Sequence, residues 1–253
     1  MKAAVHGRII KHLSPRAESV RRRPVERRAA IYGWKRGLDL TLIVATLPIW
    51  LPLMILVMLF VQAVSAGPVF YRQERVGYRR RKFLLYKFRS MKVNADTTSH
   101  ECYFERLMKC DAPMAKLDAA DDRIIPGGRI LRATGLDELP QIFNVIRGEM
   151  SLVGPRPCTV REFARYQPQD KERVNAPPGL TGYWQVNGKN RTTFSQMIEM
   201  DIYYTKNMSV KLDLVIILMT LPAIFRQTFC AVPRRADSMI SSSSFRRAEV
   251  SDK

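Results

Sequence analysis

The stretch LTLIVATLPIWLPLMILVMLFV, from Leu40 to Val61, decides the fold, because it holds 22 residues without a charge. A straight helix of that length would measure about 33 Å, enough to cross a hydrocarbon core of roughly 30 Å. Pro48 and Pro52 stand near its middle, and each removes a backbone donor and clashes with the preceding turn. We therefore predict a sharp bend there, set by one or other of the two prolines.

Basic residues lie on both sides of this stretch. Residues 1–37 carry 11 Lys or Arg against two Glu, and residues 71–92 carry nine against one. Positive flanks stay on the cytoplasmic face, so a single crossing would have to export one of them. The pattern favours a re-entrant helix-hairpin that enters and leaves on one side, with an ordinary kinked transmembrane helix as the alternative.

The net charge of +19 points to nucleic acid or to an anionic membrane surface. Residues 93–230 contribute only +1 of it, so the excess brackets the apolar stretch and favours the membrane. The four cysteines form no CxxC pair and the three histidines have no metal-ligand spacing, so we expect reduced thiols and no zinc site. The apolar run starts 40 residues into the chain without a signal-peptide cleavage site, which argues against secretion.

We predict a mixed α/β, mostly helical fold with four segments. These are a basic flexible extension over 1–33, a re-entrant membrane helix over 34–66, a compact cytoplasmic catalytic domain with interfacial helices over 67–229, and a disordered tail over 230–253.

Periodicity predicts a small β-hairpin followed by helices. The strands are Val69–Arg75 and Lys82–Ser90, and the second places Lys87 and Arg89 on one face. The expected helices cover residues 93–122, 138–147, 160–166 and 195–207. An interfacial or core helix is expected over 212–225, with an interruption at Pro222.

The helix over 138–147 places Asp137 and Glu138 at its beginning, with Gly148 as its stop. Adjacent helical side chains diverge by about 100°, so the two carboxylates suit different tasks. The helix dipole favours an ionised Asp137, available as a nucleophile or a metal ligand. Simple capping is the commoner role of acidic residues at this position.

Basic side chains elsewhere could complete a phosphate site. Lys87, Arg89, Arg156 and Arg173 are candidates for surrounding a diphosphate. Two carboxylates and a diphosphate offer oxygen ligands only, which suits Mg²⁺. No histidine follows His100, so carboxylates would carry any acid–base or nucleophilic work.

Taken together, the segments resemble the monotopic phosphoglycosyl transferases of the bacterial sugar transferase family, in their minimal form without a multi-helix membrane domain. The matching segments are KRGLD (35–39), GPVFYRQERVG (67–77), KFRSM (87–91), LDELPQIFNVIRGEMSLVGPRP (136–157), PGLTGYWQVNG (178–188) and DIYY (201–204). LDELPQ followed by MSLVGPRP and PGLTG is highly specific.

The resemblance implies transfer of a sugar 1-phosphate from a UDP-sugar to undecaprenyl phosphate, with release of UMP and with Mg²⁺ as the metal. It implies that Asp137 is the nucleophile and metal ligand and Glu138 the partner carboxylate. It places Lys87, Arg89, Arg156, Arg173, Gln185 and Asp201 in the substrate-binding set. It also implies the cytoplasmic face of the bacterial inner membrane, a pathway such as exopolysaccharide synthesis, and leaves a homodimer open.

Two rival functions remain at this point. A non-enzymatic membrane scaffold would use the basic flanks alone and would tolerate Asp137→Asn and Glu138→Gln. A nucleic-acid binder is disfavoured by the near-neutral region over 93–230.

Overall fold

A computed structural model describes residues 25–93, 95, 105–108, 110, 112–114 and 121–230. Most of the predicted basic extension, most of the predicted helix over 93–122 and nearly all of the predicted tail fall outside these residues, so those expectations stay predictions.

The apolar stretch forms two successive helices, α2 (Val25–Ala45) and α3 (Leu47–Val64). The break is at Thr46, two residues before Pro48, and Pro52 lies inside the unbroken α3. The helix therefore breaks two residues before Pro48, and not at either proline as predicted. Pro48 occupies the first turn of α3, where its missing N–H costs no hydrogen bond, so α3 starts just ahead of it.

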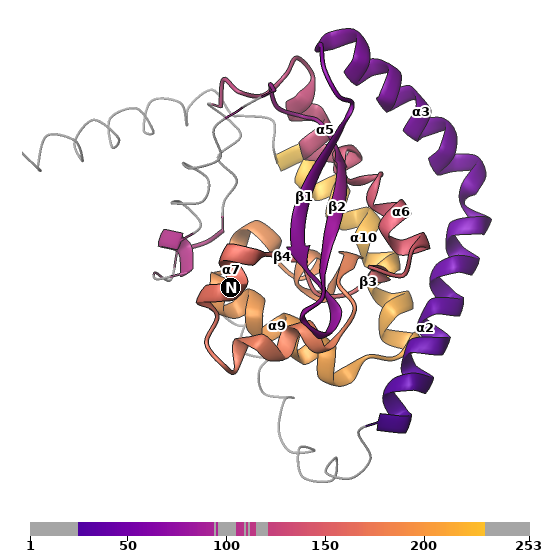
Figure 1. Cartoon of the computed structure of the whole chain (residues 1–253), viewed down its shortest axis with the longest axis vertical. Helices are drawn as coiled ribbons and strands as arrows, with labels where there is room; N and C mark the ends of the chain where they lie inside the picture. The colour runs from indigo at the N-terminus through magenta and orange to yellow at the C-terminus, as the bar shows by residue number, and fades with distance from the viewer. Residues whose placement is uncertain are drawn as a thin grey trace, which may run out of the picture.

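The two helices form an open arc along one edge of the domain (Figure 1), and the predicted entry and exit on one side of the membrane stays a prediction. Side chains donate hydrogen bonds to the carbonyls at the break. The Trp50 indole donates to the Ile43 carbonyl at 2.9 Å, and the Thr46 hydroxyl donates to the Leu42 carbonyl at 2.7 Å. A break in an apolar environment needs such partners, since no water is there to bond the freed groups.

α3 has two apolar faces. Trp50, Met54, Val57 and Val61 recur at helical spacing and are buried against the domain. The opposite face exposes large apolar side chains, namely Leu47, Ile49, Leu51, Ile55, Leu56, Leu59 and Phe60. Within the described residues, α3 is the one helix long and apolar enough to cross a membrane by length and composition.

The predicted β-hairpin is confirmed. β1 (Phe70–Val76) and β2 (Lys82–Phe88) pair antiparallel around the short turn η1 (Tyr78–Arg80), with Phe70 opposite Phe88. β4 (Cys158–Thr159) joins the free side of β1 and gives the order β2-β1-β4. A separate parallel pair, which was not predicted, joins β3 (Ser151–Val153) to β5 (Gly179–Thr181).

Short helices fill the rest of the domain. They are α5 (Gly128–Thr134), η3 (Leu136–Glu138), α6 (Gln141–Ile146), α7 (Val160–Arg165), η4 (Asp170–Asn175), α8 (Tyr183–Val186) and η5 (Lys189–Arg191), followed by the longer α9 (Phe194–Asn207). The predicted helices over 160–166 and 195–207 match α7 and α9. Thr159 and Thr193 start these two helices with capping boxes, each closed by the side chain three residues later.

The last described helix, α10 (Val210–Cys230), is longer than predicted, because it continues through Pro222. Asp213 and Ile216 are buried against the domain, while Leu218, Leu221 and Phe225 are exposed. Pro222 removes one backbone hydrogen bond, and the helix remains continuous across it.

The core lies between these elements. One cluster joins α2 and α3 to the hairpin, α5 and α6; a second lies around α7 and α9; a third joins β3, α9 and α10. The mixed, mostly helical fold with small sheets is thus confirmed.

Candidate active site

Asp137 and Glu138 lie on the single 3-10 turn η3 between α5 and α6. Gly135 ends α5 at a φ of +76°, a conformation that favours glycine, and its carbonyl accepts the Glu138 N–H at 3.0 Å. The prediction that both carboxylates begin the helix is wrong, since α6 starts at Gln141. Pro140 has no N–H for the Leu136 carbonyl, so regular helical bonding begins after it.

The two carboxylates have different surroundings, as expected for separate tasks. Asp137 is buried, with 6% of its surface exposed. Glu138 is partly exposed, and its Oε1 accepts from the Lys87 ammonium at 2.8 Å. Lys87 comes from β2, so the hairpin delivers a positive charge directly to the turn that carries the carboxylates.

Arg89, which the sequence grouped with Lys87, contacts a different element. Its guanidinium donates to the carbonyls of Ser65 and Ala66, directly after the end of α3. Its Nε is buried without a hydrogen-bond partner in the described part of the chain. Arg89 therefore holds the backbone directly after α3, and the structure does not bring it to Glu138.

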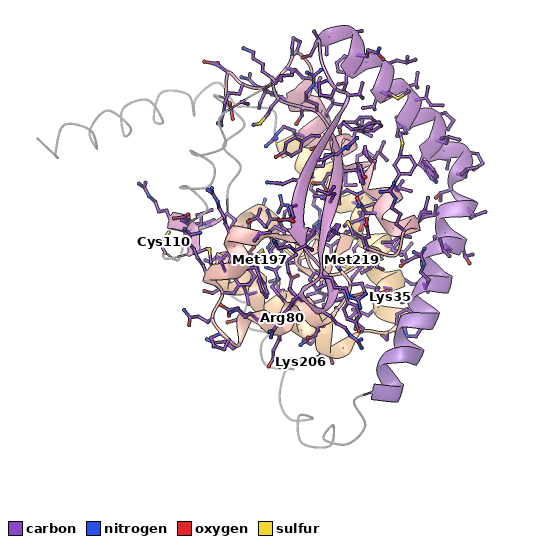
Figure 2. The ribbon with its side chains drawn as sticks, in the orientation of Figure 1. Lys35, Arg80, Cys110, Met197, Lys206 and Met219 are labelled. Atoms are coloured by element: carbon purple, nitrogen blue, oxygen red, sulfur yellow. The ribbon has the colours of Figure 1, made fainter. Side chains whose placement is uncertain are left out.

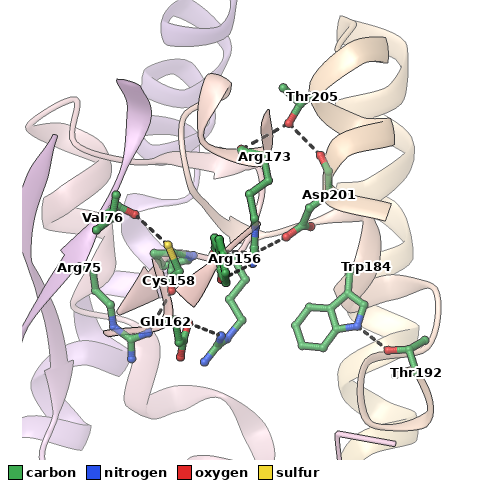
Figure 3. Close-up of polar contacts among 12 residues, drawn as sticks. Arg75, Val76, Arg156, Cys158, Glu162, Arg173, Trp184, Thr192, Asp201 and Thr205 are labelled. Atoms are coloured by element: carbon green, nitrogen blue, oxygen red, sulfur yellow. Dashed lines mark hydrogen bonds and ion pairs between the residues drawn. The ribbon is translucent and has the colours of Figure 1, made fainter. Parts of the chain in front are cut away.

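A second polar cluster surrounds Arg156 (Figure 3). The Arg173 guanidinium forms a buried ion pair with Asp201 and donates to the Arg156 carbonyl at 2.9 Å and to the Tyr166 hydroxyl at 2.8 Å. The backbone of Arg156 also bonds to Asp201. The Arg156 side chain, 29% exposed, pairs with Glu162 at 3.4 Å.

Burial separates the roles within this cluster. The side chains of Arg173 and Asp201 are each 1% exposed, so they reach no ligand as they stand and instead hold the backbone of Arg156. Burial raises the pKa of Asp201 to about 6, although the charges of Arg173 and Arg156 act in the opposite direction. Burial would lower the pKa of Arg173, but Tyr166 and Asp201 outweigh it and raise that pKa, so the guanidinium stays charged.

The two clusters lie along the same hairpin. Lys87 is opposite Tyr71, and Arg75, whose guanidinium donates to the Pro157 carbonyl at 3.0 Å, lies four residues further along β1. Four residues of strand span roughly 13 Å. The carboxylates and the arginines thus mark two ends of an elongated region.

Two of the sequence motifs meet at glycines. A Cβ on Gly179 would lie 2.0 Å from the Gly154 backbone nitrogen, so GPRP and PGLTG can pack only without side chains here. Gln185 lies against this contact: its Nε2 donates to the Leu180 carbonyl at 3.2 Å, and its Oε1 is buried without a partner among the described atoms. Gln185 therefore lies near the GPRP segment that carries Arg156.

The carboxylates suit a magnesium ion held partly by substrate. The described residues contain no cluster of three or more His, Cys, Asp or Glu side chains that would form an all-protein site. Mg²⁺ accepts one or two carboxylates together with phosphate oxygens and water. Asp137, with Glu138 beside it, fits that donor set.

The sequence match covers most of the described chain, since the family described as "Bacterial sugar transferase" matches residues 30–227. The chain belongs to the bacterial sugar transferase family. The match includes both helices of the arc, the hairpin, η3 and the Arg156 cluster, so the family assignment covers every element that builds the candidate site.

Relatives within the bacterial sugar transferase family differ in length. The exopolysaccharide production protein ExoY of Sinorhizobium fredii is 36% identical over 75% of this chain and 84% of its own length. The galactosyl transferase CpsE of Streptococcus agalactiae is 41% identical over 65% of this chain, and the undecaprenyl-phosphate galactose phosphotransferase of Salmonella typhimurium is 36% identical over 76%. The chain spans only 36% and 40% of these last two relatives.

One residue of this sugar transferase site was missed from the sequence. Asn144 is fully buried and accepts the Tyr86 N–H at 3.1 Å, while its amide donates at 2.7 Å to the Leu84 carbonyl and to Glu149. It thereby joins α6 to the edge of β2, next to Lys87. The available signal was a polar side chain within the apolar stripe over 139–146.

Proposed function

We propose that this protein transfers a sugar 1-phosphate from a UDP-sugar to undecaprenyl phosphate and releases UMP. The observation that carries the proposal is the buried Asp137 beside the Lys87–Glu138 ion pair, in a chain of the bacterial sugar transferase family. Two relatives support both substrate classes. They are the undecaprenyl-phosphate galactose phosphotransferase of Salmonella typhimurium and a UDP-glucose:undecaprenyl-phosphate glucose-1-phosphate transferase of Xanthomonas campestris.

The reaction would proceed in two displacements at one phosphorus atom. The Asp137 carboxylate attacks the β-phosphorus, the bond from that phosphorus to the bridging oxygen breaks, and UMP leaves. A phosphate oxygen of undecaprenyl phosphate then attacks the same phosphorus, which breaks the bond to Asp137 and restores the carboxylate. Lys87 would offset the charge of the phosphates, and Glu138, held by Lys87, would assist the attack of the acceptor phosphate as the partner carboxylate.

Magnesium belongs to this proposal as an expected cofactor. Asp137 and Glu138 would hold it together with the diphosphate of the donor. When bound, the ion supplies charge neutralisation between the anionic reactants. Arg156, held by the buried Arg173–Asp201 pair, would bind the nucleotide side of the donor.

The same proposal places the protein on the cytoplasmic face of the bacterial inner membrane, with α2 and α3 entering and leaving one leaflet. The basic flanks support this topology. The side-chain hydrogen bonds to the Leu42 and Ile43 carbonyls support it too, because they allow a helix break within an apolar environment. There a lipid phosphate and a soluble nucleotide sugar can reach the same carboxylate. The ExoY relatives support a place at the start of exopolysaccharide synthesis.

Trapping the covalent intermediate tests the function. Protein in lipid nanodiscs is incubated with UDP-sugars labelled with ³²P in the β-phosphate, without acceptor, and then denatured. We expect labelled protein and an equal amount of UMP. Label should be lost on adding undecaprenyl phosphate and should be absent in Asp137→Asn. Label that persists in Asp137→Asn, or UMP release that continues in it, would overturn the assignment.

A further inference from the structure

Three charged side chains of the KRGLD segment, Lys35, Arg36 and Asp39, leave the same stretch of α2 and bond to separate parts of the domain. From the sequence, Lys35 and Arg36 were interpreted only as part of the basic flank that predicts membrane topology. In the structure Lys35 and Asp39 are buried, and all three bond to groups far away in the sequence. Figure 2 shows Lys35 on the side of α2 that faces the domain.

Arg36 bonds to the helix that follows the catalytic turn. Its guanidinium donates through Nη1 to the Val145 carbonyl and through Nη2 to the Ile146 carbonyl. These carbonyls belong to the last turn of α6, where positive charge is favoured, and the Val145 carbonyl also accepts the Gly148 N–H at 2.9 Å. A planar guanidinium is suited to two carbonyls at once.

α6 is a short rigid link between this contact and the carboxylates. It contains six residues, and two residues separate its start from the end of η3. Asn144 fixes its side to β2, the strand that delivers Lys87. With its end on Arg36 and its side on β2, α6 transmits the position of α2 to Asp137 and Glu138.

Lys35 and Asp39 fix the other side of the contact. The Lys35 ammonium pairs with Asp213 of α10 and donates to the Tyr204 hydroxyl at 2.8 Å. Asp39 accepts from the Ser151 hydroxyl and the Leu152 N–H, both at 3.0 Å, on β3. α2 is therefore attached to α10, α9 and β3 as well as to α6, so it cannot tilt against the domain without breaking buried bonds.

We propose that Arg36 is a positioning residue, which sets the height of the catalytic turn relative to the membrane helix so that the Asp137-bound phosphate meets the lipid phosphate. This proposal rests on the proposed function. The first displacement uses a soluble donor that can follow the site wherever it lies. The second uses an acceptor whose depth is set by the bilayer, so a small displacement of the turn affects the second step.

The two half-reactions separate this role from a general structural one. In nanodiscs, we compare Arg36→Lys, which keeps the charge but cannot bond both carbonyls in the same plane, with Arg81→Lys, the same exchange at an exposed arginine after η1. Adduct formation from labelled UDP-sugar should stay within twofold of wild type in both. Transfer from the adduct to undecaprenyl phosphate should fall at least tenfold in Arg36→Lys only. Equal losses in both steps, or no loss in either, would refute the positioning role.

Hydrogen exchange provides a readout that needs no activity. Amides of 136–147 should exchange faster in Arg36→Lys than in wild type, while those of 194–207 in α9 should not change. Unchanged protection over 136–147 would also count against the proposal. If wild-type protein forms no adduct with any donor, the proposed function fails, and the exchange result alone decides whether Arg36 fixes α6.

Discussion

At the scale of single residues, the degree of burial separates the charged side chains: the proposed nucleophile Asp137 keeps 6% of its surface exposed, whereas the side chains of Arg173 and Asp201 keep 1% each. Glu138, Lys87 and Arg156 are partly exposed, whereas Arg173 and Asp201 are enclosed and bond to the backbone of Arg156. The buried Arg173–Asp201 pair supports the partly exposed Arg156 by bonding to its backbone. Residue type and spacing made both sets equally good candidates for the site, because a sequence does not reveal burial.

Burial of ion pairs leads to a stability prediction for Asp213. Asp213→Asn should lower the free energy of unfolding by about 3–5 kcal/mol, because it leaves the Lys35 ammonium enclosed without its charge partner. Glu172→Gln, which removes the partner of Lys206 in an exposed pair, should cost less than about 1 kcal/mol. Chemical denaturation of both variants in the same micelles measures the difference. Equal effects would contradict the view that Lys35 is a buried anchor.

The pKa of Asp201 leads to a prediction about pH. Because burial raises this pKa to about 6, above the usual value for a free aspartate, the folded state binds the proton more tightly than the unfolded chain. The resulting stabilisation is complete below about pH 4 and is lost as the pH rises through 6. Relative to Asp201→Asn, wild-type protein should therefore lose on the order of 3 kcal/mol of unfolding free energy between pH 4 and pH 7. A difference that is constant with pH would show that Asp201 stays ionised.

At the scale of elements, local patterns were sufficient wherever short-range bonds define the structure. The hairpin was predicted to within two residues at each end, and α7 and α9 begin where their threonine capping boxes lie. The break at Thr46 was missed by two residues. Pro48 in the first turn of α3 is compatible with a helix start at Leu47, and the Trp50 indole bonds the Ile43 carbonyl beside the break, a contact that proline positions do not indicate.

Contacts between distant segments could not be predicted in the same way. The parallel pairing of β3 with β5 depends on Gly154 and Gly179, which lie 25 positions apart and touch without side chains. The roles of Lys35, Arg36 and Asp39 depend on partners more than 100 residues away. Residue patterns and the resemblance together predicted the site residues, and only the fold identifies the ones that support them.

Asn144 provides a test at the scale of elements. Asn144→Ala should lower the free energy of unfolding by about 2–4 kcal/mol, since it leaves the Tyr86 N–H and the Leu84 carbonyl without their partner. It should also reduce overall transfer, because β2 then no longer holds Lys87 against the turn. Asn207→Ala, which removes an exposed bond at the end of α9, is the matched control and should change both quantities little. Thermal unfolding and product formation measured on the same samples would show it, and wild-type activity in Asn144→Ala would contradict it.

At the scale of the whole molecule, the apolar surfaces are not confined to α3. α10 exposes Leu218, Leu221 and Phe225, and α5 exposes Ile130, with Leu218 at 72%. These side chains lie on elements outside the α2–α3 arc. Exposed apolar side chains are costly in water, so we expect this part of the domain to rest on a membrane surface, in line with the proposed membrane association.

The topology of the arc can be measured directly on the whole protein. In a variant without native cysteines, Gly33→Cys and Arg81→Cys place single thiols on either side of the apolar stretch; a Cβ at Gly33 meets no atom within 4 Å, and Arg81 is exposed. Both thiols should react with a membrane-impermeant maleimide in inside-out vesicles, and neither should react in intact spheroplasts. A helix that crosses the bilayer would expose one thiol in each preparation, because α3 is long enough to span. That outcome would remove the one-sided geometry through which Asp137 is proposed to reach both a soluble donor and a lipid phosphate.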